Sequence, residues 1–318
     1  MRIGTRGSAL ALAQARLVAE RLGGGEIVVV RTRGDEEASE GATPRSGDKS
    51  RWVGELEQAL LAGDVDLAVH SAKDVPGEIS HGLELLGAPA RSAAEDALVG
   101  AGSLQELPRG GRVGTSSVRR AAQLRAARPD LRVVSLRGNV DTRLRKLADS
   151  AARTHQTRGE VEQEGALDAI VLASAGLARL GRESEIGCTL DSASFVPAPG
   201  QGTLALQGRV DDGATRAAVA PILDGDASAC LKAERALARA LDASCNTPLG
   251  AYAEPAGCGC LYLRAWVGLP DGSQWISDEL LGGFYDPDEL GRRLGERLEA
   301  VGARALLERP EEATLERS

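Results

Sequence analysis

Aromatic side chains are scarce in this sequence of 318 residues, at only 3% of the total. The cores must therefore be built mainly from alanine, valine, leucine and isoleucine. Long hydrophobic runs are absent too, and none approaches the length that crosses a bilayer. The five cysteines form no regular framework, which excludes a small disulfide-stapled scaffold and agrees with a reducing compartment. We therefore expect a cytoplasmic protein that makes no membrane contact.

The N-terminal stretch resembles a signal peptide only briefly, because polar residues interrupt "ALALA" too early for a hydrophobic signal region. A helix from Ser8 to about Leu22, capped by Ser8, explains the pattern better. The five-cysteine count and this helix together favour the cytoplasm.

Lysine is also scarce: only four of the 38 basic residues are lysines, namely Lys49, Lys73, Lys146 and Lys232. Arginine is thus the default cation, and a retained lysine is the more informative residue. The net charge of −8 argues against a general nucleic-acid binder. The arginine-rich stretch 118–132 has alanine and leucine at helical spacing, so we interpret it as a solvated helix face.

Strand and helix signals alternate over the first two thirds of the chain, which predicts α/β domains with largely parallel sheets. After about residue 220 the pattern changes. Two β-rich runs flank Asp271-Gly272, a hairpin signal, and an amphipathic helix follows from about Pro287 to Leu307. This favours a small α+β C-terminal domain. Residues 148–165 are polar and fit a helix extension or a surface insertion.

The segment "VHSAKDVP", residues 69–76, follows an apolar strand pattern and brings Lys73 and Asp74 to the carboxyl end of that strand. Ligands of α/β sheets bind at this end. Asp74 has two open interpretations. In the first it is a turn residue before Pro76 or an ion-pair partner of Lys73. In the second it is a carboxylate that faces a part of the ligand where positive charge develops.

Three loops share one design, in which a strand is followed by a short polar turn and a helix. Hydroxyls and backbone N–H groups at a helix start form a ready site for an anion. Each loop alone is also explained by ordinary helix capping. Together they indicate a cleft for a ligand with several carboxylates or phosphates. The side chains concerned are Arg6 and Ser8; Thr115, Ser116, Ser117, Arg119 and Arg120; and Arg137, Asn139 and Arg143.

Seven motifs occur in the order and approximate spacing found in the porphobilinogen deaminases, also called hydroxymethylbilane synthases, and the chain resembles this family over nearly its whole length. The motifs are "TRGSALALAQA", "VHSAKDVP", "GTSSVRR", "SLRGNVDTRL", "AGLARLG", "PAPGQGTLAL" and "SCNTPLGAYAE".

The resemblance implies a transferase of porphyrin and heme biosynthesis that condenses four porphobilinogen molecules, with loss of ammonia, to the linear tetrapyrrole hydroxymethylbilane. It implies a self-assembled dipyrromethane cofactor, joined by a thioether to the position of Cys245. Asp74 matches the catalytic aspartate of the family, which binds pyrrole N–H groups and stabilises a cationic azafulvene. The family works as a monomer.

Further residues match positions that hold carboxylates of cofactor or substrate in the family. Those matched to the cofactor are Ser71, Lys73, Thr115, Ser117, Arg119, Arg120 and Arg137. Those matched to the substrate are Arg6, Ser8, Lys49, Arg143 and Arg179. Arg45, Gln14 and Gln201 are further candidates. No histidine lies near the Cys258-x-Cys260 pair, so we expect no metal there.

The family fold has two α/β domains, similar to the lobes of periplasmic binding proteins, with a cleft between them. By the resemblance, domain 1 comprises residues 1–90 with a return segment at 200–219, domain 2 comprises 93–194, and domain 3 comprises 222–318. The sequence departs from the family in the loop 45–52, where a mobile lid is expected, and in Ala243-Ser244, where the family has two glycines.

A non-catalytic two-lobed protein that grips a polyanion is the alternative. It leaves Asp74 and Cys245 without a role.

Overall fold

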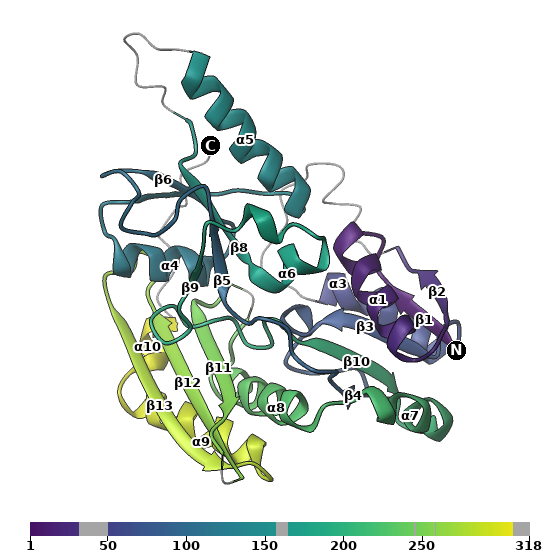
Figure 1. The fold of residues 1–318 in the computed structure, drawn as a ribbon. Helices are drawn as coiled ribbons and strands as arrows, with labels where there is room; N and C mark the ends of the chain where they lie inside the picture. Colours follow the sequence, from purple (N-terminus) through teal and green to yellow (C-terminus); the bar gives the residue numbers. More distant parts are fainter. Residues whose placement is uncertain (32–49, 157–164, 245, 258, 308–318) are drawn as a thin grey trace.

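The computed structural model describes residues 1–31, 50–156, 165–244, 246–257 and 259–307. The chain forms three sheets, each flanked by helices (Figure 1). The first sheet has the strand order β2-β1-β3-β10-β4. Its strands are β1 (Arg2–Thr5), β2 (Glu26–Val29), β3 (Leu67–Ser71), β4 (Leu83–Gly87) and β10 (Leu204–Arg209).

The second sheet has the order β7-β6-β8-β5-β9 and repeats the pattern of the first. Its strands are β5 (Asp96–Val99), β6 (Arg112–Gly114), β7 (Arg132–Val134), β8 (Ala169–Ala173) and β9 (Cys188–Leu190). In each sheet, three neighbouring strands are parallel, and the last two pairings are antiparallel. The prediction of two α/β domains is confirmed. The prediction of largely parallel sheets is confirmed, because among the described strands four of the five in each sheet run in one direction, while β10 and β5 each run against their neighbours.

Helices with apolar faces cover these two sheets. They are α1 (Ala9–Arg21), α3 (Ser50–Ala62) and α7 (Gly213–Val219) around the first sheet, and α4 (Val118–Ala127), α5 (Val140–Gln156) and α6 (Ser174–Arg179) around the second. Ala15 and Val18 of α1 lie in one buried cluster with Leu67 and Val69 of β3. Burying such side chains is worth about 1.5–3 kcal/mol each for valine and leucine.

The C-terminal part is a three-stranded antiparallel sheet with helices against it. Its elements are α8 (Gly225–Ala240), β11 (Leu249–Pro255), β12 (Cys260–Gly268), β13 (Trp275–Gly283), α9 (Pro287–Ala300) and α10 (Ala303–Leu307). The predicted hairpin at Asp271-Gly272 is confirmed. The prediction of one helix from Pro287 to Leu307 is wrong, because Gly302 adopts φ +97°, which ends α9 and separates it from α10.

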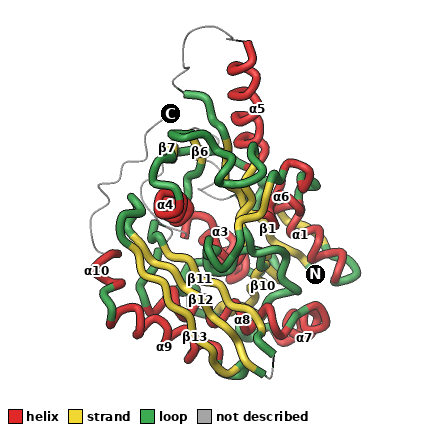
Figure 2. Tube along the Cα trace, turned by 60° about the vertical axis from the view of Figure 1, so that its left-hand side comes forward, coloured by secondary structure: helices red, strands yellow, loops and turns green. Residues whose placement is uncertain are grey.

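The sheets pack through small side chains, as the scarcity of aromatic residues requires. Ala227 and Leu231 of α8 lie in a buried cluster with Val75 and Ala205 from the first sheet region. Figure 2 shows the three-stranded sheet beside α4 on one flank, with α8 next to β10 on the other. The C-terminal part therefore contacts both α/β halves.

The domain limits 1–90 with 200–219, 93–194 and 222–318 stay predictions. Among the described residues, no helix is both long enough and apolar enough to span a bilayer.

Candidate active site

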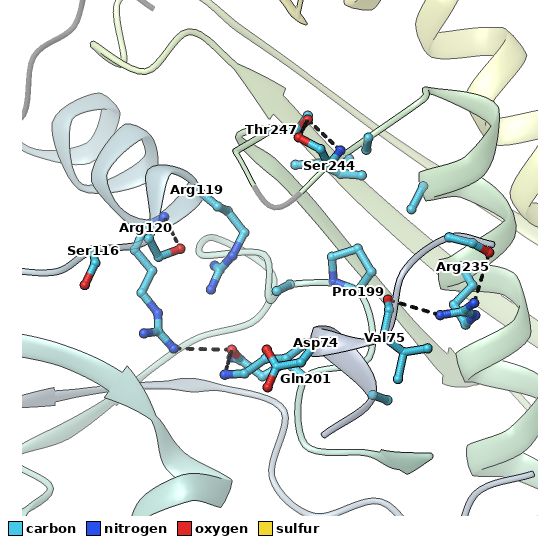
Figure 3. A pocket seen from close by; sticks show the side chains of 18 of the residues that line it. Asp74, Val75, Ser116, Arg119, Arg120, Pro199, Gln201, Arg235, Ser244 and Thr247 are labelled. Carbon is cyan, nitrogen blue, oxygen red and sulfur yellow. Dashed lines mark hydrogen bonds between the residues drawn. The ribbon is translucent and has the colours of Figure 1, made fainter. Parts of the chain in front are cut away.

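A cavity of about 280 Å³ lies where the three parts of the chain meet (Figure 3). Two smaller cavities, of about 90 and 50 Å³, share lining residues with it, and we call the three together the cleft. The 280 Å³ cavity receives Lys73 and Asp74 from the first half, Arg119, Arg120 and Arg143 from the second, and Arg235, Ser244 and Thr247 from the C-terminal part.

Asp74 is held by the turn that follows β3. The strand is buried along its length, and a 3₁₀ turn, η1 (Ala72–Asp74), begins where it ends. Gly200 packs against this turn at φ +74°, and a Cβ there would lie 2.9 Å from the carbonyl carbon of Ala72. Because position 200 carries no side chain, the segment Pro199–Gln201 can lie directly against the turn that carries Asp74.

The carboxylate of Asp74 lines both the 280 Å³ and the 50 Å³ cavities. Within the described residues, no hydrogen bond to it is found, whereas its neighbour Lys73 donates to Oε1 of Gln201 at 3.4 Å. The interpretation of Asp74 as the ion-pair partner of Lys73 thus has no support from a direct contact. Asp74 is available to a ligand.

Burial lowers the pKa of Lys73 to about 8, and the nearby Arg120 guanidinium adds to the effect while Asp74 opposes it. A lysine among like charges loses its proton more readily. A ligand carboxylate beside Lys73 would raise its pKa again and stabilise the ammonium form.

Asp96, at the start of β5, joins the two arginines of α4. Its Oδ2 accepts from Nη2 of Arg119 at 2.7 Å, and its Oδ1 accepts from Nε of Arg120 at 2.8 Å. Nε2 of Gln201 donates to the same carboxylate at 2.9 Å. Asp96 is fully buried, and these partners hold its pKa at about 2 against the opposing effect of burial. The pair of arginines therefore carries one net positive charge after Asp96 is counted.

Five of the six guanidinium nitrogens of these two arginines donate to protein groups. Nη1 of Arg119 donates to the carbonyl of Val196 at 2.8 Å, and Nη1 of Arg120 donates to that of Val171 at 3.1 Å. Nε of Arg119 is buried and has no partner among the described residues. An unpaired buried donor costs about 1–3 kcal/mol, so a ligand acceptor there would be stabilising.

Arg143 and Arg179 lack a carboxylate partner in the described part of the chain and share the 90 Å³ cavity with Lys73. Burial lowers the pKa of each to about 10. Nε of Arg179 and Oγ1 of Thr203 are buried without partners in the described residues. This cavity gathers positive charge and unsatisfied polar atoms, as a site for a carboxylate would.

The predicted helix starts are capped by their own side chains. Oγ of Ser8 accepts from the N–H of Ala11 at 3.3 Å, and Oγ of Ser117 accepts from that of Arg120 at 3.4 Å. Oδ1 of Asn139 caps α5 by accepting from Thr142. Capping, the alternative interpretation, thus explains part of each loop signal.

The cleft brings together most of the predicted site residues. It is lined by Arg6, Ser8, Gln14, Ser71, Lys73, Asp74, Ser117, Arg119, Arg120, Arg143, Arg179 and Gln201. Thr115 is buried and, like the exposed Arg137, does not line it. Lys49, Arg45 and Cys245 lie outside the described residues, as do residues 45–49 of the predicted lid. Ser244 and Thr247, on either side of Cys245, line the 280 Å³ cavity.

Sequence reasoning missed the buried polar residues that support the cleft. Nε2 of His70 lies 2.9 Å from Oε1 of Gln207, whose Nε2 donates to Glu57 at 2.7 Å. Because Gln207 offers His70 an acceptor, His70 carries its proton on Nε2. Burial lowers the pKa of His70 to about 4, so the ring is neutral at pH 7. In the sequence, one feature could have indicated Asp96: it is a charged residue at the start of an apolar strand, in "EDALVG".

The cleft, with several cations around one carboxylate, has the features expected of an enzyme that acts on small molecules carrying several carboxylates. Comparison with known families gives the particular one. Residues 1–217 match the model described as porphobilinogen deaminase, dipyromethane cofactor binding domain, and residues 228–300 match the porphobilinogen deaminase C-terminal domain.

Curated relatives agree with the family models. The chain is 43% identical over 317 residues to the porphobilinogen deaminase of Syntrophobacter fumaroxidans, with 97% of each chain covered. It is 44% identical over 315 residues to that of Xanthomonas oryzae pv. oryzae, with 96% of this chain and 98% of the relative covered. The chain belongs to the porphobilinogen deaminase family, which confirms the resemblance, the transferase class and the dipyrromethane cofactor.

Two solved structures show a distant similarity. A periplasmic substrate-binding protein of an ABC transporter from Coxiella burnetii matches with a TM-score of 0.38 and 15% identity, covering 70% of this chain and 91% of that one. A methionine-bound nutrient binding protein from Burkholderia cenocepacia matches with a TM-score of 0.36 and 12% identity, covering 69% and 90%.

Proposed function

We propose that this chain condenses four porphobilinogen molecules to hydroxymethylbilane in the cleft, with Asp74 as its catalytic carboxylate. The observation that carries the proposal is the position of Asp74, which has no hydrogen-bond partner among the described residues and lies among cations that do. A protein that only bound a polyanion would gain no affinity for its ligand from a carboxylate at this position.

Lys73, Arg143 and Arg179 are proposed to hold the acetate and propionate groups of the substrate. Their support is the shared 90 Å³ cavity and the unpartnered Nε of Arg179. Arginine–carboxylate hydrogen bonds are charge-assisted and fix orientation as well as affinity. The substrate ring would then be held with its carboxylates toward Arg143 and Arg179 and its N–H toward Asp74.

Asp74 is proposed to accept the pyrrole N–H and to stabilise the positive charge that develops as ammonia leaves porphobilinogen. A carboxylate in a water-poor cleft gives typically about 3–4 kcal/mol of such stabilisation. It is also the group in reach to take the proton lost after each carbon–carbon bond forms, which is worth about 10²–10⁴-fold.

The residues of the cleft fit a dipyrromethane with its own carboxylates. Nε of Arg119, which is buried and has no partner in the part of the chain that the structure describes, can donate to a carboxylate of the cofactor, and Arg120 and Ser117 line the same cavity. We propose that these residues hold the cofactor and that Cys245 attaches it. The support for Cys245 is that Ser244 and Thr247 line this cavity. The cofactor supplies the free pyrrole α-carbon on which the chain is extended.

Asp96 is proposed to be a positioning residue, because it fixes Arg119 and Arg120 without lining the cleft itself. We further infer that the enzyme is a monomer of the cytoplasm that binds no nucleic acid, which rests on the net charge of −8 and on the family resemblance.

Intact mass spectrometry tests the proposal. Purified wild-type protein should exceed the mass of the bare chain by two pyrrole units and should gain further units when porphobilinogen is added. Cys245→Ser should have the bare mass, since a hydroxyl is a far weaker nucleophile than a thiolate. Cys188→Ser, at a half-buried position outside the cleft, is the matched control and should keep the cofactor. A wild-type protein that binds porphobilinogen but never gains covalent mass would be a passive binder.

A further inference from the structure

A second cavity, of about 510 Å³, lies outside the cleft, between α4 and the strands β12 and β13. We call it the tryptophan cavity. Its helix wall is made of small side chains, Ala126 and Ala127, which leave the space open. Its volume falls in the range of about 300–1,000 Å³ that is usual for small-molecule sites.

Two indole rings form the opposite wall. Trp266 is almost buried, at 6% exposed, whereas Trp275 is 51% exposed. Their ring centroids are 6.4 Å apart, and the planes differ by 23°, so the rings are stacked. Trp266 is held in a buried cluster with Ala122 and Val196, which makes it a rigid base for the exposed ring. An exposed, stacked tryptophan is unexpected in a chain with 3% aromatic residues.

The two carboxylates of the tryptophan cavity are each paired with an arginine, in contrast to the cationic cleft. Asp278 and Glu279 contribute carboxylates and Arg264 one guanidinium. Nε of Arg264 lies 3.5 Å from Oε2 of Glu279, and Asp278 accepts from Arg297 at 2.8 Å. Glu279 remains 57% exposed in its side chain, so it can accept further hydrogen bonds from a ligand.

We propose that the tryptophan cavity binds a small aromatic molecule that carries an ammonium arm. Indole is the ring that attracts cations best, and an aromatic ligand ring also stacks on it favourably. A carboxylate beside that ring gives the ammonium a charge-assisted hydrogen bond. An anionic aromatic molecule would place its charge beside Glu279 and the negative faces of the indole rings, which disfavours its binding. The binding claim does not depend on the proposed reaction.

This ligand chemistry has two sources. One is porphobilinogen, whose pyrrole bears an aminomethyl group, and that assignment rests on the proposed function. The other is an unrelated aromatic amine.

The tryptophan cavity is connected to the cleft through the backbone of one residue, Val196. The carbonyl oxygen of Val196 accepts from Nε2 of Gln123 at 2.9 Å and from Nη1 of Arg119 at 2.8 Å. The N–H of Val196 donates to Oε1 of Gln123 at 2.7 Å. Gln123 and Val196 line the tryptophan cavity, and Arg119 lines the cleft. A ligand that shifts Val196 or Gln123 therefore changes the hydrogen bonds of Arg119, so occupancy of one site affects the other.

Calorimetric titration with two matched probes tests the binding. We expect 2-phenylethylammonium to bind the wild-type holoenzyme and 3-phenylpropionate, of similar size but opposite charge, not to bind at the tryptophan cavity. Trp275→Leu and Glu279→Gln should each weaken the binding of the ammonium probe about tenfold, which corresponds to 1.4 kcal/mol. Tyr285→Leu, at an aromatic residue 93% exposed and outside the tryptophan cavity, is the control and should bind normally.

The proposal would be overturned if both cavity variants bound the ammonium probe as wild type does. It would also be overturned if the two probes bound equally well and Trp275→Leu abolished the binding of both. Competition identifies the source: porphobilinogen that displaces the probe in wild-type protein is itself the occupant, whereas no displacement assigns the site to another amine.

The connection is tested by turnover. Saturating 2-phenylethylammonium should change the rate of porphobilinogen consumption at least about twofold in wild type and leave it unchanged in Trp275→Leu. If the turnover rate of wild type does not change when the probe is bound, the connection through Val196 is refuted. The stability of both variants is first compared with that of wild type by thermal unfolding. If Trp275→Leu is destabilised, the turnover test is made with Glu279→Gln, which alters one exposed group.

Discussion

Nη2 of Arg235, on helix α8, donates to the carbonyl oxygen of Pro76 at 2.7 Å, two residues after Asp74. The same nitrogen donates to Gly77 at 3.0 Å, and Nη1 donates to Val75 at 3.4 Å. The C-terminal part of the chain therefore holds the turn that carries Asp74. Three backbone carbonyls that share one guanidinium cannot shift independently.

Arg235→Met should release that turn. We expect kcat to fall by at least about tenfold while the three sheets stay folded, because a misplaced catalytic group costs rate even when binding is kept. Arg239→Met, on the next turn of α8, removes an exposed arginine that pairs with Asp288 and is the matched control. Steady-state kinetics with circular dichroism checks both. Equal rates for the two variants would show that Arg235 only packs α8.

Asp96→Asn should remove the charge that holds Arg119 and Arg120. Breaking a buried pair by removing one partner typically costs about 3–5 kcal/mol, because the remaining cation is left uncompensated. We expect a fall of this size in the free energy of unfolding and loss of cofactor assembly. Denaturant unfolding and intact mass measure the two effects. Asp66→Asn breaks the half-exposed pair with Arg2 and should cost at most about 1 kcal/mol.

Asp74→Asn should fold and still carry cofactor, since asparagine has almost the same size and the carboxylate makes no protein hydrogen bond in the described residues. Loss of the charge and of the base should lower turnover by several orders of magnitude. Asp74→Glu keeps the charge but displaces it by one methylene and should retain a small activity. Single-turnover release of ammonia is the measurement. A near-normal rate in Asp74→Asn would show that Asp74 in "KDVP" serves only as a turn residue.

Lys73 should make substrate binding depend on pH. Its pKa is about 8, so the ammonium is lost as the pH rises through this value, and the attraction for a carboxylate is lost with it. We expect KM to rise between about pH 7 and 9. Lys73→Arg should flatten that rise, because a guanidinium stays charged throughout. A KM that rises equally in both proteins would assign the titration to another group.

Local patterns in the sequence determined the elements that position the site. Ser8 before the first helix, the apolar run that becomes β3, and Asp271-Gly272 between two β-rich runs each specify a conformation within a few residues. The same locality explains the residues found by resemblance, since Lys73, Asp74 and the α4 arginines occur in short motifs. The prediction of one helix over 287–307 was wrong because the amphipathic spacing continues across Gly302, whereas the backbone of Gly302 leaves the helical conformation.

Tertiary structure alone decided which distant residues meet. The return of β10 beside β3, the convergence of Asp96, Gln201 and Arg120, and the hold of Arg235 on Pro76 all join residues more than twenty positions apart. No periodicity records such pairs, because they arise when whole elements pack together. The sequence showed that the chain has many arginines; the fold determined that Asp96 neutralises part of their charge and that Asp74 faces the cleft without a partner among the described residues, since burial and pairing are properties of the packed molecule.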